Sequence, residues 1–459
     1  MQRKKILIIF VLVTIGILLL LLAFLGIRSA MNSGGDSDDA LFGNTTTVRE
    51  PPPEEPEPEV GVEGGTTSWG NGSDNQFGVP VLRMLSKEPV AGSVGVLVEP
   101  SGYTPEEYAR FIERSTGHVK DARLERVEEP VTVRNDTMLR IGRVFWSPNG
   151  TTSLVQRLDA DGVRVYSYLT TFGLEFTPPA STSSSSTEPV LAATNGRHLE
   201  SDSVITAAVS PDARSIFYIT KTDEGSVGYI ESVPLGIRRE VWRSPLRSFT
   251  ARWDTPETLV LYTNPSSDMF GYLWFLDVGT GNAKLVLGDE YALAGRMDAS
   301  GKRLLYSVQE QGSSITSLRV LAVDTGAVTF LSPEVSAPIE KCAWGTKYQD
   351  LVYCAVPRNI SVLNYLENWY LGVLASDDAI WQVNIATGEA HLILDPVELT
   401  TRAFDIVDLE VSPLGDFLVF KTKQDDILWA AVIPAERLPV VPVSGEGEPV
   451  ANAQPETAL

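Results

Sequence analysis

The chain has 459 residues, of which 43% are hydrophobic and 21% are charged, and its formal net charge is -22. Such an acidic surface repels phosphate backbones and anionic headgroups, because nucleic-acid affinity depends on Lys and Arg displacing counterions. The composition therefore argues against a nucleic-acid partner.

The N-terminus combines a basic stub with an apolar segment. Positions 3–5 are basic, and residues 6–27 are uncharged and almost wholly apolar. As a helix this segment would be about 33 Å long, enough to cross a bilayer. We therefore expect residues 1–28 to be a stub and a single-pass signal anchor in the cell membrane, with the N-terminus cytoplasmic and the rest extracytoplasmic. A cleaved signal peptide is the alternative, although Ile27 and Arg28 are not the small residues of a cleavage site.

Two segments of biased composition flank the predicted folded region. Residues 29–78 are rich in Pro, Gly and Glu with few large apolar side chains, which favours a disordered, extended and self-repelling linker. Residues 434–459 are rich in Pro, Glu and Ala, and we expect a disordered tail. The region between them, residues 79–433, shows strand alternation without a convincing long amphipathic helix.

A turn-and-strand phrase recurs along this region. Its copies occupy residues 145–155, 208–219, 252–263, 296–308, 342–356 and 410–422. The shortest steps between them are about 45 residues, which is typical of four-stranded propeller blades. The repeat therefore predicts an all-β fold, a β-propeller of four-stranded antiparallel blades.

Counting units predicts seven blades. We place them at about 87–127, 138–200, 201–246, 247–291, 292–333, 338–397 and 403–433. The last unit offers only three strands, so another segment must supply its fourth. Residues 79–85 (VPVLRML) resemble the outer strands of other units, and we predict that they pair with residues 427–433 and close the ring.

The phrases WSPNG, VSPDARS and VSPLGD, each followed by an apolar strand, carry a family resemblance. They resemble the WD40-like PD40 repeats of TolB-type and prolyl-oligopeptidase-type propellers, over roughly residues 80–433. The plan of anchor, acidic spacer and ring resembles membrane-anchored propeller proteins of small-genome bacteria. The resemblance implies a protein-interaction module of the cell envelope. The chain differs by having a tether in place of TolB's N-terminal α/β domain, so TolB's partners are not carried over.

An insertion in the sixth unit, residues 357–378, offers candidate binding residues. It places Asn368, Trp369 and Tyr370 in a predicted loop, with Asp377 and Asp378 at its exit. Amides and large rings in a loop suit a protein-binding hot spot or carbohydrate stacking. The alternative is that the rings pack on the rim of the propeller or cap its central channel.

Cys342 and Cys354 are the only cysteines, and they flank a predicted hairpin symmetrically around Tyr348. In simple register they face each other, so a cross-strand disulfide would form outside the cytoplasm. Two small buried thiols are the alternative.

The sequence offers little support for an enzyme. A serine hydrolase of the oligopeptidase kind would need a G-x-S-x-G elbow, which is missing. The three histidines fall in different units, so we expect no metal site, and no cofactor is indicated. The first interpretation is a non-enzymatic module that binds an envelope protein, and the second is a glycan- or cell-wall-binding module. The third, a hydrolase at the channel mouth, would use carboxylates such as Glu334, Glu398, Asp405 and Asp408.

Overall fold

The computed structural model describes residues 75–99, 104–172, 193–199, 203–358, 360 and 364–435. The predicted signal anchor, most of the linker, the Ser-rich segment at 178–189 and most of the tail lie outside the described residues. Within the described ranges, none of the helices has the length and apolar character needed to span a membrane.

In the described part of the chain, antiparallel strands form five four-stranded sheets and one seven-stranded sheet. The first three sheets contain β2 (Val90–Val98), β3 (Glu106–Glu113), β4 (Val119–Arg123) and β5 (Val131–Arg134); β6 (Ile141–Trp146), β7 (Thr152–Leu158), β8 (Val165–Phe172) and β9 (Ala193–His198); and β10 (Val204–Val209), β11 (Ser215–Thr222), β12 (Gly225–Ser232) and β13 (Arg238–Ser244).

The seven-stranded sheet contains β14 (Phe249–Arg252), β15 (Thr258–Thr263), β16 (Phe270–Asp277), β17 (Ala283–Met297), β18 (Arg303–Gln309), β19 (Thr316–Ala322) and β20 (Val328–Phe330). The last two sheets contain β21 (Cys342–Trp344), β22 (Leu351–Pro357), β23 (Asp378–Asn384) and β24 (Ala390–Leu394); and β25 (Ile406–Val411), β26 (Phe417–Thr422), β27 (Leu428–Val432) and β1 (Leu82–Met84). The short helices are η1 (Ile339–Lys341), α2 (Tyr365–Tyr370) and α3 (Pro396–Thr400).

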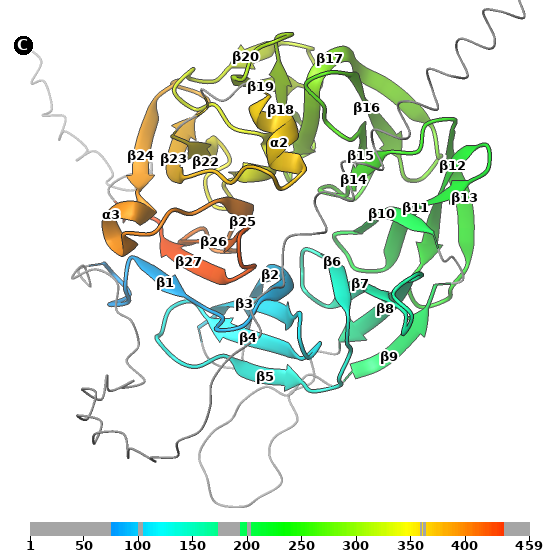
Figure 1. Cartoon of the computed structure of the whole chain (residues 1–459), viewed down its shortest axis with the longest axis horizontal. Helices are drawn as coiled ribbons and strands as arrows, with labels where there is room; N and C mark the ends of the chain where they lie inside the picture. Colours follow the sequence, from blue (N-terminus) through cyan, green and yellow to red (C-terminus); the bar gives the residue numbers. More distant parts are fainter. Residues whose placement is uncertain are drawn as a thin grey trace, which may run out of the picture. The chain divides into compact units, whose positions relative to one another are not determined.

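The sheets are arranged around a common axis, with β2, β6, β10, β14 and β25 toward the centre and β5, β9, β13, β20, β24 and β1 at the periphery (Figure 1). This arrangement is a β-propeller. In the seven-stranded sheet, β17 pairs with β16 through its first part and with β18 through its second. One strand of 15 residues therefore joins two sets of strands without an intervening loop.

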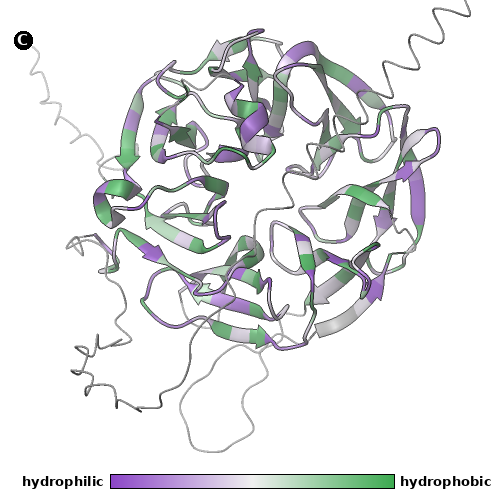
Figure 2. Cartoon of the chain, viewed as in Figure 1, coloured by the Kyte–Doolittle hydropathy of each residue, from purple (hydrophilic) through white to green (hydrophobic). Residues whose placement is uncertain are grey.

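The core lies between neighbouring sheets. The second strands β22 and β26 are buried along their whole length, because each sheet packs on both faces. One apolar cluster joins Val260 of β15, Leu305 of β18 and Val352 of β22. Figure 2 shows apolar residues along the strands of all the sheets. No sheet could bury both faces alone, so the stacking of the sheets is what stabilises each of them.

The recurring phrase has a local physical role in the turn between first and second strands. Ser147, Ser210 and Ser412 each accept a hydrogen bond at Oγ from the backbone N–H five residues later, at 3.0, 2.9 and 3.0 Å. In the copy that begins with Asp298, the carboxylate Oδ1 takes this place, accepting from the N–H of Arg303 at 3.1 Å. The residue three positions on has a positive φ in all four turns: Gly150, Ala213, Gly301 and Gly415.

The predicted closing strand is confirmed. Leu82 of β1 pairs with Ala431 of β27, and Met84 pairs with Trp429. The N–H of Leu85 extends the ladder by donating to the carbonyl of Leu428 at 2.8 Å. The pairing removes an exposed edge from β1 and from β27.

One predicted boundary is wrong. The sequence predicts the first unit at about 87–127, but its fourth strand, β5, begins at Val131. The connection between β4 and β5 is longer than the repeat predicts. There the Arg83 guanidinium donates to the carbonyls of Arg123, Leu124 and Arg126, so the closing strand holds this connection in place.

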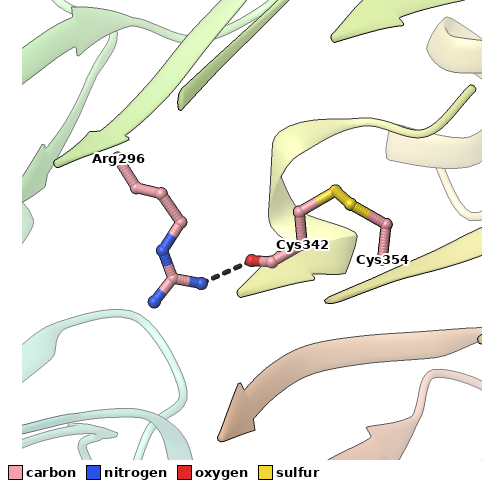
Figure 3. Close-up of a disulfide and its surroundings, with 3 residues drawn as sticks. All are labelled: Arg296, Cys342 and Cys354. Carbon is pink, nitrogen blue, oxygen red and sulfur yellow. Dashed lines mark hydrogen bonds between the residues drawn. A yellow bond between two sulfur atoms is a disulfide. The ribbon is translucent and has the colours of Figure 1, made fainter. Parts of the chain in front are cut away.

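The cysteines lie directly opposite each other, as simple register predicts. Cys342 of β21 pairs with Cys354 of β22, and the structure joins their sulfur atoms in a disulfide (Figure 3). Both residues are fully buried in the largest apolar cluster. The Cys342 carbonyl also accepts a hydrogen bond from Nη1 of Arg296 at 2.5 Å, which links this hairpin to β17 (Figure 3).

Candidate partner-binding face

The insertion of the sixth unit contains a helix. The sequence predicted a loop at positions 368–370, but these residues belong to α2, which lies between β22 and β23. Tyr365, Leu366 and Trp369 are buried on one side of this helix and cluster with Ala292 of β17. Their spacing of one and four positions places them on one helical face. The insertion is therefore packed on the ring through that face.

A fully buried lysine lies beneath α2. Lys341 Nζ, at the end of η1, donates to Asp378 Oδ2 at 2.5 Å, Asp405 Oδ1 at 2.7 Å, Ser376 Oγ at 2.9 Å and the Ile406 carbonyl at 3.0 Å. The side chains of Lys341, Asp378 and Asp405 are at most 1% exposed. A buried ammonium is tolerated only when it is paired and hydrogen-bonded, and here both conditions are met. We call Lys341, Ser376, Asp378 and Asp405 the lysine network.

Trp369 connects α2 to the lysine network. Its Nε1 donates to both carboxylate oxygens of Asp405, at 2.9 and 3.1 Å. The ammonium groups of Lys341 and Lys423 lie 4.9 and 3.9 Å from the centre of the Trp369 ring. Lys423 Nζ also donates to the Trp369 carbonyl. Cation–π attraction and hydrogen bonding therefore act together on this indole.

The two aspartates of the network differ in their protonation behaviour. Burial raises the pKa of Asp378 above its ordinary value, and the Lys341 ammonium opposes that rise without cancelling it. Burial acts in the same direction on Asp405. There, the Lys341 ammonium and hydrogen bonds from Trp369 and Ser376 outweigh burial and lower the pKa. Of these two aspartates, Asp405 therefore stays ionised to the lower pH.

Most of the predicted binding residues make internal contacts. Trp369 is only 3% exposed, so its ring is not available to a partner in this conformation, and the packing alternative describes it correctly. Asp378 is buried in the lysine network. The Tyr370 hydroxyl donates to Glu340 Oε1 at 2.7 Å, and burial together with the Glu340 carboxylate raises the pKa of Tyr370 well above its usual value.

The other two predicted residues lie nearer the surface. Asn368 is partly buried, and its carbonyl accepts from the N–H groups of Val373 and Leu374 at 2.9 and 3.1 Å. Asp377 is partly buried, with Oδ2 at 3.6 Å from Nε of Arg358. The structure therefore brings the five predicted residues into one region, where they mainly fix the insertion.

A second set of contacts ties α2 to the loop between β15 and β16. Glu367 Oε1 accepts from Ser266 Oγ and from the Ser267 N–H, both at 2.6 Å. The Ser266 carbonyl in turn accepts from the N–H of Ala292 at 2.7 Å. The α2 insertion is thus bonded to a loop about 100 positions earlier in the chain.

Four large apolar side chains beside these contacts are exposed. Met269 and Phe270 belong to the β15–β16 loop and the start of β16, and Leu371 and Val373 follow α2. Their exposed fractions are 68%, 51%, 75% and 77%. The sequence prediction missed all four, because a single apolar residue in a loop carries no signal of its exposure.

A separate charged cluster lies on the innermost strands. Arg252 Nη2 of β14 lies 3.5 Å from Asp254 Oδ1. Burial and the nearby charge of Arg252 lower the pKa of Arg296 in β17 to about 10. Burial raises the pKa of Glu410 in β25, and the Arg296 guanidinium opposes this rise. Opposite charges from two sheets, the seven-stranded one and the one that contains β25, therefore partly neutralise one another.

The carboxylates considered for a hydrolase do not share partners. Asp405 is paired with Lys341, and Asp408 Oδ2 lies 2.9 Å from Lys421 Nζ. Glu334 lies between β20 and η1, and Glu398 lies on α3; both are exposed. Across the described ranges, no group of three or more His, Cys, Asp and Glu side chains is placed to hold a metal ion.

No protein-family model matches the chain, and no curated protein matches it. The chain is similar to the solved structure of TolB from Acinetobacter baumannii, at 12% identity over 65% of this chain and 78% of that chain, with a TM-score of 0.38. It is similar to the β-propeller domain of the Trilobed protease from Pyrococcus furiosus, at 11% identity over 75% and 93%, with a TM-score of 0.42. It is also similar to the β-propeller domain of Swd1 from Myceliophteria thermophila, at 11% identity over 77% and 100%, with a TM-score of 0.43. At these values the likenesses carry no argument about function.

Proposed function

We propose that this protein is a seven-bladed β-propeller that binds another protein of the cell envelope and catalyses no reaction. The count of seven follows from dividing the seven-stranded sheet at β17. The basic stub and apolar segment at residues 3–27 support a membrane tether with the ring outside the cytoplasm. The disulfide between Cys342 and Cys354 is consistent with that oxidising location.

The observation that carries the proposal is the way α2 is held. This helix takes no part in the sheet ladders, yet a buried lysine network and the Glu367 contacts fix it to the ring. The residues that follow it, Leu371 and Val373, expose their apolar side chains. A rigidly held insertion that presents exposed apolar side chains is typical of a protein-interaction site, because preorganisation lowers the entropic cost of binding.

The alternative functions have less support. Glycan binding relied on stacking by exposed rings, but Trp369 is buried and the Tyr370 hydroxyl is bonded to Glu340. Hydrolysis relied on carboxylates at the channel mouth, but Asp405 and Asp408 are each engaged by a different lysine. A protein partner is therefore the function that the geometry supports best.

Site-specific photocrosslinking tests the proposal. A photoreactive amino acid replaces Val373 in the full-length chain in its native membrane, and a matched variant carries it at Ile237, which is 69% exposed between β12 and β13. We expect a discrete protein adduct from position 373 and none from position 237. Equal adducts at both positions, or retention of the chain on isolated wall polymer with no protein adduct, would contradict the proposal.

A further inference from the structure

The turn between β12 and β13 differs in its surface from the turns after β16, β19 and β23, which share its backbone arrangement. In each, a glycine N–H donates to the carbonyl four residues earlier at 2.8 Å: Gly236, Gly281, Gly326 and Gly388. The residue before the glycine is threonine in the other three turns but Leu235 here, and Ile237 follows the glycine. These two side chains are 72% and 69% exposed. Because the same turn forms with threonine, the fold does not require them, and their exposure indicates a binding role.

Arginines lie next to this apolar turn. Arg238 and Arg239 follow it directly and are exposed. A Cβ atom on Gly236 would lie 3.8 Å from the guanidinium carbon of Arg197, so a third guanidinium group borders the turn. The carboxylate paired with Arg197 belongs to Glu231, which is buried. The turn therefore combines exposed apolar side chains with exposed positive charge, although the net charge of the chain is -22.

The chain enters the ring at the end of the sheets that carries this kind of turn. β1 is antiparallel to β27, with Leu82 opposite Ala431, so β1 begins where β27 ends. In the other units, the same end carries the turn after the third strand, such as the turn after β12. Just before β1, the ring of Phe77 lies 4.8 Å from the ring of Phe417, the first residue of β26. The described residues nearest in sequence to the predicted anchor are therefore at this end.

Hydrogen bonds between turns place these ends on one face of the ring. The Val233 N–H donates to the Arg214 carbonyl at 2.8 Å, so the β12–β13 turn lies beside the β10–β11 turn. A series of bonds continues through the β6–β7 turn and β3 to the β25–β26 turn: Thr152 Oγ1 to the Ala213 carbonyl at 3.4 Å, Arg110 Nη1 to the Gly150 carbonyl at 2.9 Å, and the Leu414 N–H to Glu107 Oε1 at 2.5 Å. We call the face that carries Leu235, Ile237 and Phe77 the entry face.

The α2 insertion lies on the opposite face. It joins β22 to β23, whereas the turn that contains Gly388 follows β23, so the two connections are at opposite ends of one strand. The Ile385 N–H donates to the Asp350 carbonyl at 2.9 Å, which places the β23–β24 turn beside the β21–β22 turn. In that second turn, Thr346 Oγ1 donates to the Ser412 carbonyl at 2.7 Å. The Gly388 end of this sheet is thus on the entry face, and α2 points the other way.

A phospholipid bilayer is the occupant that these observations favour. Two apolar side chains are too few for a stable protein interface, but a tethered ring meets its own membrane at high effective concentration, so a small contact suffices. We infer that the β12–β13 turn docks on the bilayer, with Leu235 and Ile237 at the headgroup boundary. Arg238 and Arg239 then lie beside lipid phosphate groups, which guanidinium groups bind well. The α2 insertion is turned away from the membrane, toward a partner. This inference rests on the membrane tether of the proposed function and adds the orientation of the ring.

The test measures how close the turn lies to lipid in the full-length chain, reconstituted in nanodiscs of phosphatidylcholine and phosphatidylglycerol. An NBD fluorophore is attached to P234C, because Pro234 is exposed and adjoins the two docking side chains. The native cysteines are joined and buried, so only the new thiol is labelled. The matched controls are D324C, at the same position of the β19–β20 turn, and V373C, on the opposite face. We expect doxyl-labelled lipid to quench position 234 about threefold or more above position 373, with position 324 between them.

Protein variants identify the side chains that dock. L235T/I237N gives the β12–β13 turn the residues that Thr280 and Asn282 supply after β16, so the turn should form normally. In the P234C background this change should lower quenching by lipid about threefold, because the apolar side chains at the boundary are lost. R238Q/R239Q should lower it about twofold, and more in discs rich in phosphatidylglycerol. The matched control T325S should leave it unchanged. Melting temperatures verify that each variant is folded.

Three results would overturn the inference. The first is equal quenching at positions 234 and 373, and the second is undiminished quenching in L235T/I237N. The third is another occupant, seen as dimers or as a protein photoadduct at position 234 that L235T/I237N abolishes. If position 234 stays in water while the chain remains in the discs and position 373 still crosslinks to a protein, the proposed function stands and only the docking is wrong. A chain that the discs fail to retain would instead disprove the tether, and with it both proposals.

Discussion

The indole of Trp369 donates to both carboxylate oxygens of Asp405, although the two residues lie 36 positions apart, in α2 and just before β25. Asp405 also accepts from Lys341, so one carboxylate joins the insertion, the connection before β21 and the connection before β25. The stability of the α2 insertion therefore depends on a buried ionic group.

Replacing Lys341 by Met should destabilise the ring strongly. The change leaves the Asp378 and Asp405 carboxylates buried without their cation, which costs about 3–5 kcal/mol in free energy of unfolding. Chemical denaturation measures the loss. The matched control is K347M, because the Lys347 side chain is half-exposed and should change stability by no more than about 0.5 kcal/mol. Adding D378N and D405N to K341M should recover part of the loss, and no recovery would contradict this electrostatic explanation.

Lowering the pH should remove the stabilisation of the folded state that ionised Asp405 provides. Because its folded pKa is lowered, Asp405 stabilises the fold above the ordinary aspartate value of about 3.9, and this stability is lost as pH falls through the lowered pKa. Asp378 has a raised folded pKa, so its protonation in acid favours the folded state and its ionisation at higher pH disfavours it. The difference in melting temperature between wild type and D405N should therefore be large at pH 7 and should shrink below about pH 4. A difference that stays constant to pH 3 would show that the charge of Asp405 is not responsible.

Loss of the closing strand should destabilise the whole ring. Leu82 is fully buried in the cluster between the last two sheets, so L82A should cost about 2–5 kcal/mol. Deletion of residues 79–85 should lower the melting temperature of all sheets together, because β27 would become an exposed edge. Differential scanning calorimetry measures both effects, with M84A at a 41% exposed position as control. An unchanged melt of the deletion variant would refute the role of β1 in closure.

Removal of the disulfide should have a moderate effect. The bridge closes a loop with a sequence separation of 12, for which the expected loss in C342A/C354A is about 2–3 kcal/mol. Urea denaturation with and without reductant measures it. Reductant should lower the stability of wild type and leave the double variant unchanged. If reductant has no effect on wild type after denaturation and refolding, the bridge does not contribute.

The repeats and the closing strand were predictable from sequence because their signals are local. The Ser and Asp side chains at positions 147, 210, 298 and 412 bond to a backbone N–H only five residues away, so the turn repeats wherever the phrase does. The register of Cys342 against Cys354 follows from the hairpin between them. Counting the repeats leaves the last unit one strand short. Residues 79–85 are an apolar segment outside the counted units, so they are the candidate for that strand.

The packing of the α2 insertion was not predictable from local sequence in the same way. The sequence predicts Asn368, Trp369 and Tyr370 as a group, but nothing local distinguishes an exposed loop from a helix packed over a buried cation. Lys341 reaches its aspartate partners 37 and 64 positions away, and Glu367 reaches Ser267 across 100 positions. The repeating strands, their turns and the closure follow from the amino-acid sequence, since they depend on neighbours along the chain or on a repeated pattern. Which rings are buried and which apolar side chains face solvent follows from the three-dimensional packing, because it depends on loops that come together when the sheets stack around one axis.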